Sequence, residues 1–167
     1  MFFGWTAFYQ MTGEAGAALV GLLFIVATLS SRQQQDGVHV GVQLFTTPTV
    51  FHLSLVLTVS ALALAPPSPV YRPAAGMFVI AIVGCLYAGP VAIRISRLAT
   101  QAHWSDFWFY GAAPCAAYLA LAGATGAAWA GAPHSAHCVG LVVLILLALG
   151  VRNAWDLITW LAPRRLV

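Results

Sequence analysis

Hydrophobic residues in this chain fall into five long runs, separated by short polar or proline-containing segments. A helix needs about 20 residues to cross about 30 Å of hydrocarbon, at about 1.5 Å per residue. Each run comes close to that length or exceeds it, and no connecting segment could hold a folded domain. We therefore expect an all-α bundle forming a single transmembrane domain over residues 1–167, with helices at about 3–31, 48–65, 73–98, 107–130 and 139–161.

Prolines predict several helix boundaries. Thr47 is placed to cap the second helix, and Pro48 suits its first helical position. The Pro66–Pro69 turn should end that helix, and Pro90 should kink the third.

Composition excludes a water-soluble monomer. The chain is 61% hydrophobic and 7% charged, with a mean hydropathy of +0.88, whereas a soluble domain averages about 25% charged residues. The net charge of +3 is too small and too scattered for nucleic-acid binding. Three cysteines lie far apart, so neither a disulfide framework nor a dithiol pair is indicated.

Arginine supplies every basic residue, and its distribution predicts the orientation. With five crossings, one side of the membrane holds only Arg72, and the other holds Arg32, Arg94, Arg97, Arg152, Arg164 and Arg165. The positive-inside rule then places the N-terminus outside and the C-terminus in the cytoplasm. We expect a multi-pass protein of a bacterial inner (plasma) membrane, in contact with the lipid bilayer.

Small residues recur at helical spacing in two of the helices, and such faces mark close helix packing in lipid. Ala112, Ala116, Ala120, Ala124 and Ala128 stand at every fourth position, and Gly13, Ala17 and Gly21 share that spacing. These faces favour a homo-oligomer, although packing within one bundle would explain them equally well.

Glu14 is the most informative residue. The apolar stretch after it spans only about 22 Å, so Glu14 is expected inside the outer quarter of the membrane. An ionisable group at that depth usually faces protein or a water-filled cavity. Steps of three and four residues that start at Gln10 keep to one face of a helix and give a stripe that is polar at both ends. Its members are Gln10, Glu14, Ala17, Gly21, Phe24 and Thr28.

This stripe predicts a pore-lining helix when several copies surround an axis. Glu14 would form an outer carboxylate ring beside Gln10, Ala17 and Gly21 would leave room below it, and Phe24 would form an apolar gate. Thr28 would add an inner polar ring. Clustered carboxylates favour hard inorganic cations, so Ca²⁺ is one candidate permeant or blocking ion. Alternatively, Glu14 pairs with Arg72 or accepts hydrogen bonds from Gln10 and Tyr71 within one subunit.

Two groups of histidines have a functional and a simpler interpretation. His52 could relay protons or bind a haem iron, but satisfaction by a neighbouring hydroxyl or carbonyl is the more frequent case. His134, His137 and Cys138 could bind Zn²⁺ with a further ligand from another subunit, although the loop is exposed and nothing nearby completes the site.

Arg152 and Asp156 lie one turn apart and should pair with each other, and a lipid-phosphate site on the neighbouring arginines is the weaker alternative. No nucleophile or metalloprotease motif is present, so we expect no enzyme and no bound cofactor.

The stretches 13–24 and 153–157 resemble the first and last helices of a family of small bacterial multi-pass membrane proteins. Glu14 and the small residues after it are also similar in design to Orai-type calcium channels, whose first helix lines an oligomeric pore beneath a glutamate ring. This chain departs from that design in its five spans and its outside N-terminus.

The sequence thus predicts a homo-oligomeric cation-selective channel. The alternative is a non-conducting scaffold or accessory subunit that binds a partner membrane protein.

Overall fold

The computed structural model describes Phe2, residues 4–31, 39–66 and 71–97, Ser105, and residues 107–161. Within these ranges all regular secondary structure is helical. The elements are α1 (Thr6–Ser31), α2 (His39–Leu64), α3 (Tyr71–Arg97), the π-helix η1 (Phe107–Ala112), α5 (Ala113–Trp129) and α6 (Ser135–Leu161). Because η1 runs into α5 without a break, the two form one continuous span.

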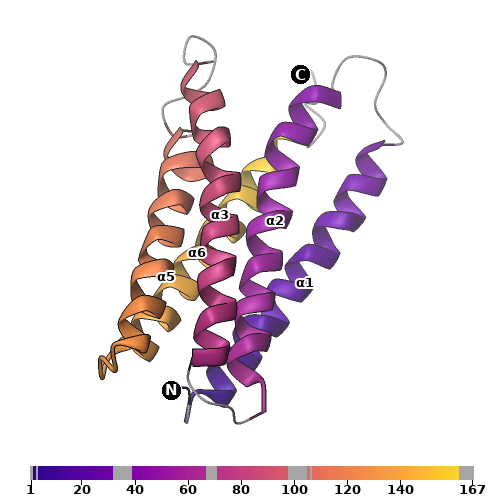
Figure 1. The fold of residues 1–167 in the computed structure, drawn as a ribbon. Coiled ribbons are helices and arrows are strands. Elements are labelled where there is room, and N and C mark those ends of the chain that lie inside the picture. Colours follow the sequence, from indigo (N-terminus) through magenta and orange to yellow (C-terminus); the bar gives the residue numbers. More distant parts are fainter. Residues whose placement is uncertain are drawn as a thin grey trace.

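The described part of the chain contains five spans that are long and apolar enough to cross a membrane, as the sequence predicts. Successive spans alternate in direction, so the start of α1 and the end of α6 lie at opposite ends of the bundle (Figure 1). The expected all-α architecture of a multi-pass membrane protein is therefore confirmed.

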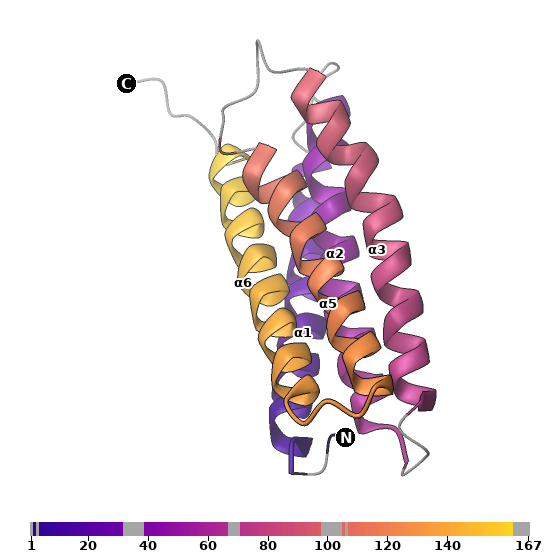
Figure 2. The ribbon, with the colours of Figure 1, turned by 60° about the vertical axis from the view of Figure 1, so that its left-hand side comes forward.

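The helices form two groups. On one side α3 packs along α5 and η1, and on the other α1 packs along α2 and touches α6. The contacts of α2 and α5 with α6 join the two groups, as Figure 2 shows from a second direction. As a result α1 lies at the edge of the bundle, and it diverges from α2 toward the Ser31 end (Figure 1). One long face of α1 is left uncovered.

Two helices begin earlier than the sequence predicts. α2 starts at His39, so Pro48 lies inside it instead of at its first position. α6 starts at Ser135, four residues before Val139. Proline removes a backbone donor, but neighbouring helices and polar side chains often satisfy the freed groups in membrane helices. The buried position of Pro48 fits that explanation.

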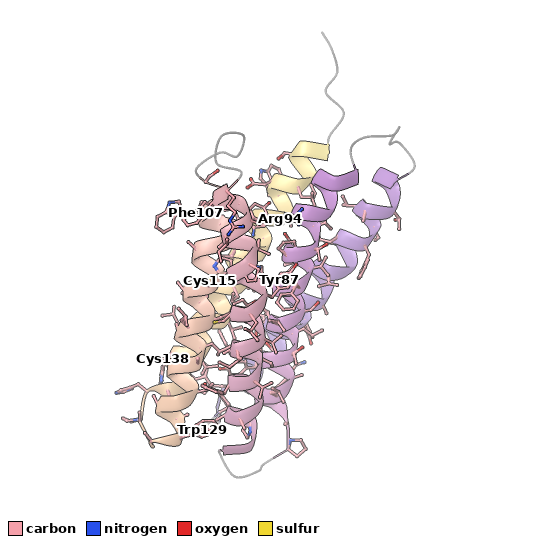
Figure 3. The ribbon with its side chains drawn as sticks, turned by 45° about the horizontal axis from the view of Figure 1, so that its top comes forward. Tyr87, Arg94, Phe107, Cys115, Trp129 and Cys138 are labelled. Carbon is pink, nitrogen blue, oxygen red and sulfur yellow. The ribbon has the colours of Figure 1, made fainter. Side chains whose placement is uncertain are left out.

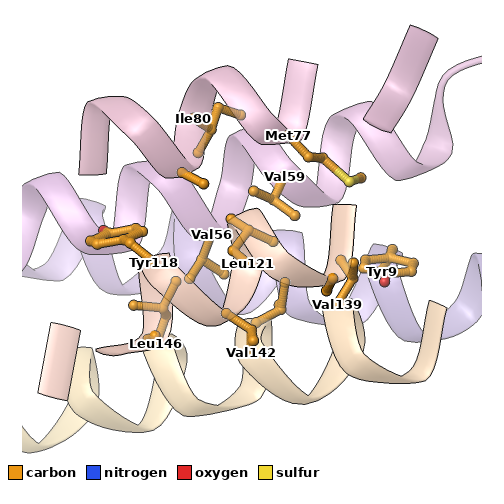
Figure 4. Close-up of a cluster of buried hydrophobic side chains, with 14 of the residues drawn as sticks. Tyr9, Val56, Val59, Met77, Ile80, Tyr118, Leu121, Val139, Val142 and Leu146 are labelled. Carbon is orange, nitrogen blue, oxygen red and sulfur yellow. The ribbon is translucent and has the colours of Figure 1, made fainter. Parts of the chain in front are cut away.

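The main core lies between the helices and draws on every span. Figure 4 shows its labelled side chains converging from all of them: Tyr9, Val56, Val59, Met77, Ile80, Tyr118, Leu121, Val139, Val142 and Leu146. A second, smaller cluster joins Leu23 of α1 to Leu53 of α2 and to Ala154 and Leu157 of α6. These two clusters determine which face of α1 points inward.

Candidate functional site

Small residues hold the inner face of α1 against α2. A side-chain carbon added at Gly13 would lie 3.2 Å from Ser60 Cβ, and one added at Gly16 would lie 3.3 Å from the Leu53 carbonyl oxygen. The Thr12 and Ser60 hydroxyls share a buried hydrogen bond of 3.0 Å beside these contacts. The close approach between α1 and α2 therefore uses Gly13 and Gly16.

This packing differs from the small-residue face expected on α1. Gly13 does contact α2, but Ala17 and Gly21 are exposed, and open space surrounds Gly21. Residues four apart advance by about 400°, so a row of them drifts around the helix by about 40° per step. The same drift divides the alanine row of α5, where Ala124 and Ala128 are buried while Ala116 and Ala120 are exposed.

All six residues expected to line a pore lie on the uncovered face of α1. Gln10, Glu14, Ala17, Gly21, Phe24 and Thr28 are each exposed, and Phe24 reaches 60%. The Gln10 amide nitrogen donates to a Glu14 carboxylate oxygen at 3.1 Å, and the Thr28 hydroxyl donates to the Ile25 carbonyl at 2.8 Å. The stripe is thus continuous, and it points away from the bundle.

Glu14 lies well inside the candidate span of α1. That span runs from Thr6 to Thr28, and Glu14 follows Thr6 by eight residues, or about 12 Å of helix. No arginine with a described side chain forms an ion pair with Glu14. Of the alternative partners within one subunit, Gln10 does donate a hydrogen bond to Glu14. The side chains of Arg72 and Tyr71 lie outside the described side chains.

His52 is buried where α2 meets α3 and α5. Its Nδ1 atom lies 2.6 Å from the Tyr118 hydroxyl of α5, and the Tyr87 ring of α3 lies 6.3 Å from the His52 ring. This contact satisfies one ring nitrogen with a hydroxyl, as the simpler of the two interpretations of His52 expects. Its Nε2 atom is buried without a hydrogen-bond partner in the described structure.

Asn153 forms a second buried polar contact, which involves the π-helix. Its Nδ2 atom donates to the Phe109 carbonyl at 3.1 Å, and the Tyr110 hydroxyl donates to the Asn153 carbonyl at 3.2 Å. A π-helical turn has altered backbone pairing, so its carbonyls are available for side-chain donors. Asn153 therefore ties η1 to α6.

Next to Asn153, Arg152 forms the ion pair expected from the sequence, with an Arg152–Asp156 distance of 2.6 Å. The Arg152 guanidinium also lies 3.6 Å from the centre of the Phe109 ring, an attractive cation–π contact. These interactions hold the Arg152 charge against η1.

Within the described residues, the possible zinc ligands on α6 and the preceding loop do not by themselves form a metal site. The His134 and His137 rings are 5.9 Å apart, and His137 packs edge-on against Trp5 at 4.9 Å. Among the residues that the structure describes, no three His, Cys, Asp or Glu side chains could hold one metal ion. Zinc binding at His134 and His137 would require ligands from a second molecule.

Sequence reasoning missed the buried contact of Asn153 and the identity of the partner of His52. Tyr118 lies in an alanine-rich run, and Asn153 directly follows Arg152. Buried tyrosine and asparagine in a membrane helix usually find a partner on another helix. That signal identifies the residue but not the partner, which is 66 positions away for His52 and Tyr118.

Comparison of this chain with protein-family models, with curated proteins and with solved structures finds no match. The arrangement of residues within the bundle is therefore the basis for any functional conclusion.

Proposed function

We propose that this protein forms a homo-oligomeric, cation-selective membrane channel, with the exposed face of α1 lining the pore. The observation that carries this proposal is the position of Glu14, which is exposed on a helix at the edge of the bundle and lies inside its apolar span. A carboxylate that faces lipid at this depth is costly. A water-filled axis between identical copies removes that cost.

The other five residues of the stripe support the same arrangement. Gln10 orients the Glu14 carboxylate by its hydrogen bond. Ala17 and Gly21 keep the axis wide below the carboxylates, and Phe24 projects far enough to form an apolar constriction. A ring of Glu14 carboxylates would attract cations, including Ca²⁺, and the Phe24 constriction would gate by dewetting.

The proposed orientation has the N-terminus outside and the C-terminus in the cytoplasm of a bacterial inner membrane. Arg94, Arg97 and Arg152 support it, because all three lie toward the end of the bundle at which α6 terminates. Positive charge gathers on the cytoplasmic side of membrane proteins. Glu14 then lies in the outer half of the pore.

Flux through liposomes that contain the full chain tests the channel. We expect wild type to conduct cations over chloride, Glu14→Gln to bring the cation-to-chloride permeability ratio close to one, and Phe24→Ala to raise the leak several-fold. Leu22→Ala is the matched control, because Leu22 is 57% exposed on α1 but lies outside the stripe. It should leave flux unchanged.

The same experiment distinguishes the channel from an accessory subunit. Subunit number is measured by native mass spectrometry on the preparations used for flux. An intact oligomer in which neither variant changes flux, or a protein that is monomeric in the bilayer, contradicts the channel. A non-conducting oligomer would instead indicate a scaffold that presents Glu14 to a partner membrane protein.

A further inference from the structure

α3 carries a second continuous exposed stripe, on a helix that belongs to the other group of the bundle from α1. Its members recur at alternating steps of four and three residues, and all of them are exposed: Val79, Val83, Leu86, Pro90, Ile93 and Arg97. The side of α3 that packs against its neighbours carries the buried residues Ala81, Ala88 and Ile95 instead. The stripe therefore presents a purely apolar surface that ends in a cation.

Arg94 adds a second cation one turn before the end of this stripe. Arg94 and Arg97 are both exposed in the last turn of α3. The described residues contain one ion pair, which joins Arg152 and Asp156. No carboxylate with a described side chain therefore forms an ion pair with Arg94 or Arg97, so within the described residues this surface carries two positive charges without a paired carboxylate.

Aromatic side chains indicate that this end of the bundle lies at the level of the headgroups. Trp108 of η1 is 53% exposed and Trp155 of α6 is 66% exposed. Figure 3 shows Arg94 at the same end of the bundle as Phe107 and far from Trp129, which lies at the other end. Tryptophan is enriched at membrane–water interfaces, and arginine reaches from there toward phosphate groups.

The part of the stripe from Leu86 to Arg97 matches the length of one lipid molecule. From Leu86 to Arg97 the helix rises about 16 Å, which is close to half of a hydrocarbon core of about 30 Å. A phospholipid whose phosphate meets Arg94 and Arg97 would therefore lay its acyl chains along Ile93, Pro90 and Leu86.

We propose that this face of α3 is a binding site for an anionic phospholipid, with Arg94 and Arg97 holding the headgroup phosphate and the apolar stripe holding the chains. Two exposed arginines that pair with no carboxylate among the described residues favour a headgroup with net negative charge over a zwitterionic one. The proposal is independent of conduction, because the stripe lies on α3 and shares no residue with α1.

Lipid binding to the full chain tests this site, with phosphatidylglycerol and phosphatidylcholine as the probes. Protein purified in detergent is titrated with each lipid, and bound lipid is counted by native mass spectrometry. Wild type should prefer phosphatidylglycerol. Since each basic residue near an anionic surface contributes about 1 kcal/mol, the double variant Arg94→Gln/Arg97→Gln should lose roughly thirtyfold in affinity for it.

Two further variants separate charge from general damage to α3. The double variant Arg94→Lys/Arg97→Lys keeps both charges and should retain most of the preference. Ser96→Ala is the matched neutral change, because Ser96 is exposed between the two arginines and its hydroxyl donates to the Ile93 carbonyl of the same helix at 2.8 Å. It should bind lipid as wild type does.

Three results would overturn the proposal. The first is equal affinity of wild type for the two lipids. The second is an unchanged preference in the double glutamine variant. The third is displacement of phosphatidylglycerol by millimolar inorganic phosphate, which would show that the arginines bind a soluble anion.

Discussion

Polar side chains occupy two contrasting regions of this molecule. In the interior, His52 and Asn153 are bonded to groups on other helices, to the Tyr118 hydroxyl and the Phe109 carbonyl. On the outer face of α1, Gln10 is bonded to Glu14 within the same helix. The first arrangement joins helices within one chain. The second does not contribute to the contact of α1 with the bundle. It leaves the polar groups of Gln10 and Glu14 exposed to solvent or to another molecule.

The comparison extends to the glycines. Gly84 of α3 supports the Tyr118 ring directly, and a methyl group added there would overlap that ring. Gly21 on the outer face of α1 has no atom within 4 Å of the position of an added methyl group. Glycine therefore allows close packing in one region and leaves open space in the other, so substitutions should separate folding from function.

The largest effect is expected for Gly84→Ala. The added methyl group would push against a buried tyrosine that its hydrogen bond to His52 holds in place, so we expect a net loss of about 2 kcal/mol of stability, as is typical of overpacking. The fraction folded is measured by titration with sodium dodecyl sulfate in mixed micelles. Gly123→Ala on α5 is the control, since its methyl group meets open space. Equal losses of stability in the two variants would contradict the tight contact between Gly84 and the Tyr118 ring.

A smaller effect is expected for Tyr118→Phe. Loss of the hydroxyl leaves His52 Nδ1 buried without its partner, so we expect destabilisation by about 1 kcal/mol. Tyr9→Phe is the matched control in the same titration. The Tyr9 hydroxyl is also buried, but it has no hydrogen-bond partner in the described structure. A loss for Tyr9→Phe as large as that for Tyr118→Phe would show that the His52 contact does not stabilise the bundle.

The sequence was sufficient for the number of spans, because a long apolar run in a helix is a local property that lipid imposes directly. It was less reliable for the start of α2, which lies nine residues before the predicted Pro48. Proline at position 48 is a good first residue for a helix in water, but the structure accommodates it inside a longer helix.

The site was predictable in part for the same reason. The spacing from Gln10 to Thr28 places these residues on one face of any α-helix, and the structure has them on one exposed face. The spacing alone could not show which face of α1 packs against α2. Gly13 belongs to two small-residue patterns, one with Gly16 and one with Ala17, and these lie on different faces of the helix. That choice depends on the shape of α2 at Ser60 and Leu53.

The smallest effect on folding, and the sharpest distinction between the two regions, is expected for Gly21→Ala. Its methyl group meets no atom of the same chain, and alanine forms helices better than glycine by about 1 kcal/mol, so the stability of the subunit should stay the same or rise slightly. In the proposed channel, however, each copy adds one methyl group to the lining below Glu14, so cation flux in liposomes should fall.

Gly123→Ala makes the same change on the exposed side of α5 and should leave flux unaltered, because that surface lies away from the proposed axis. If both variants reduced flux equally, the effect would come from the bilayer-facing surface in general and not from a pore along α1. If Gly21→Ala lowered subunit stability, the outer face of α1 would be part of the fold after all.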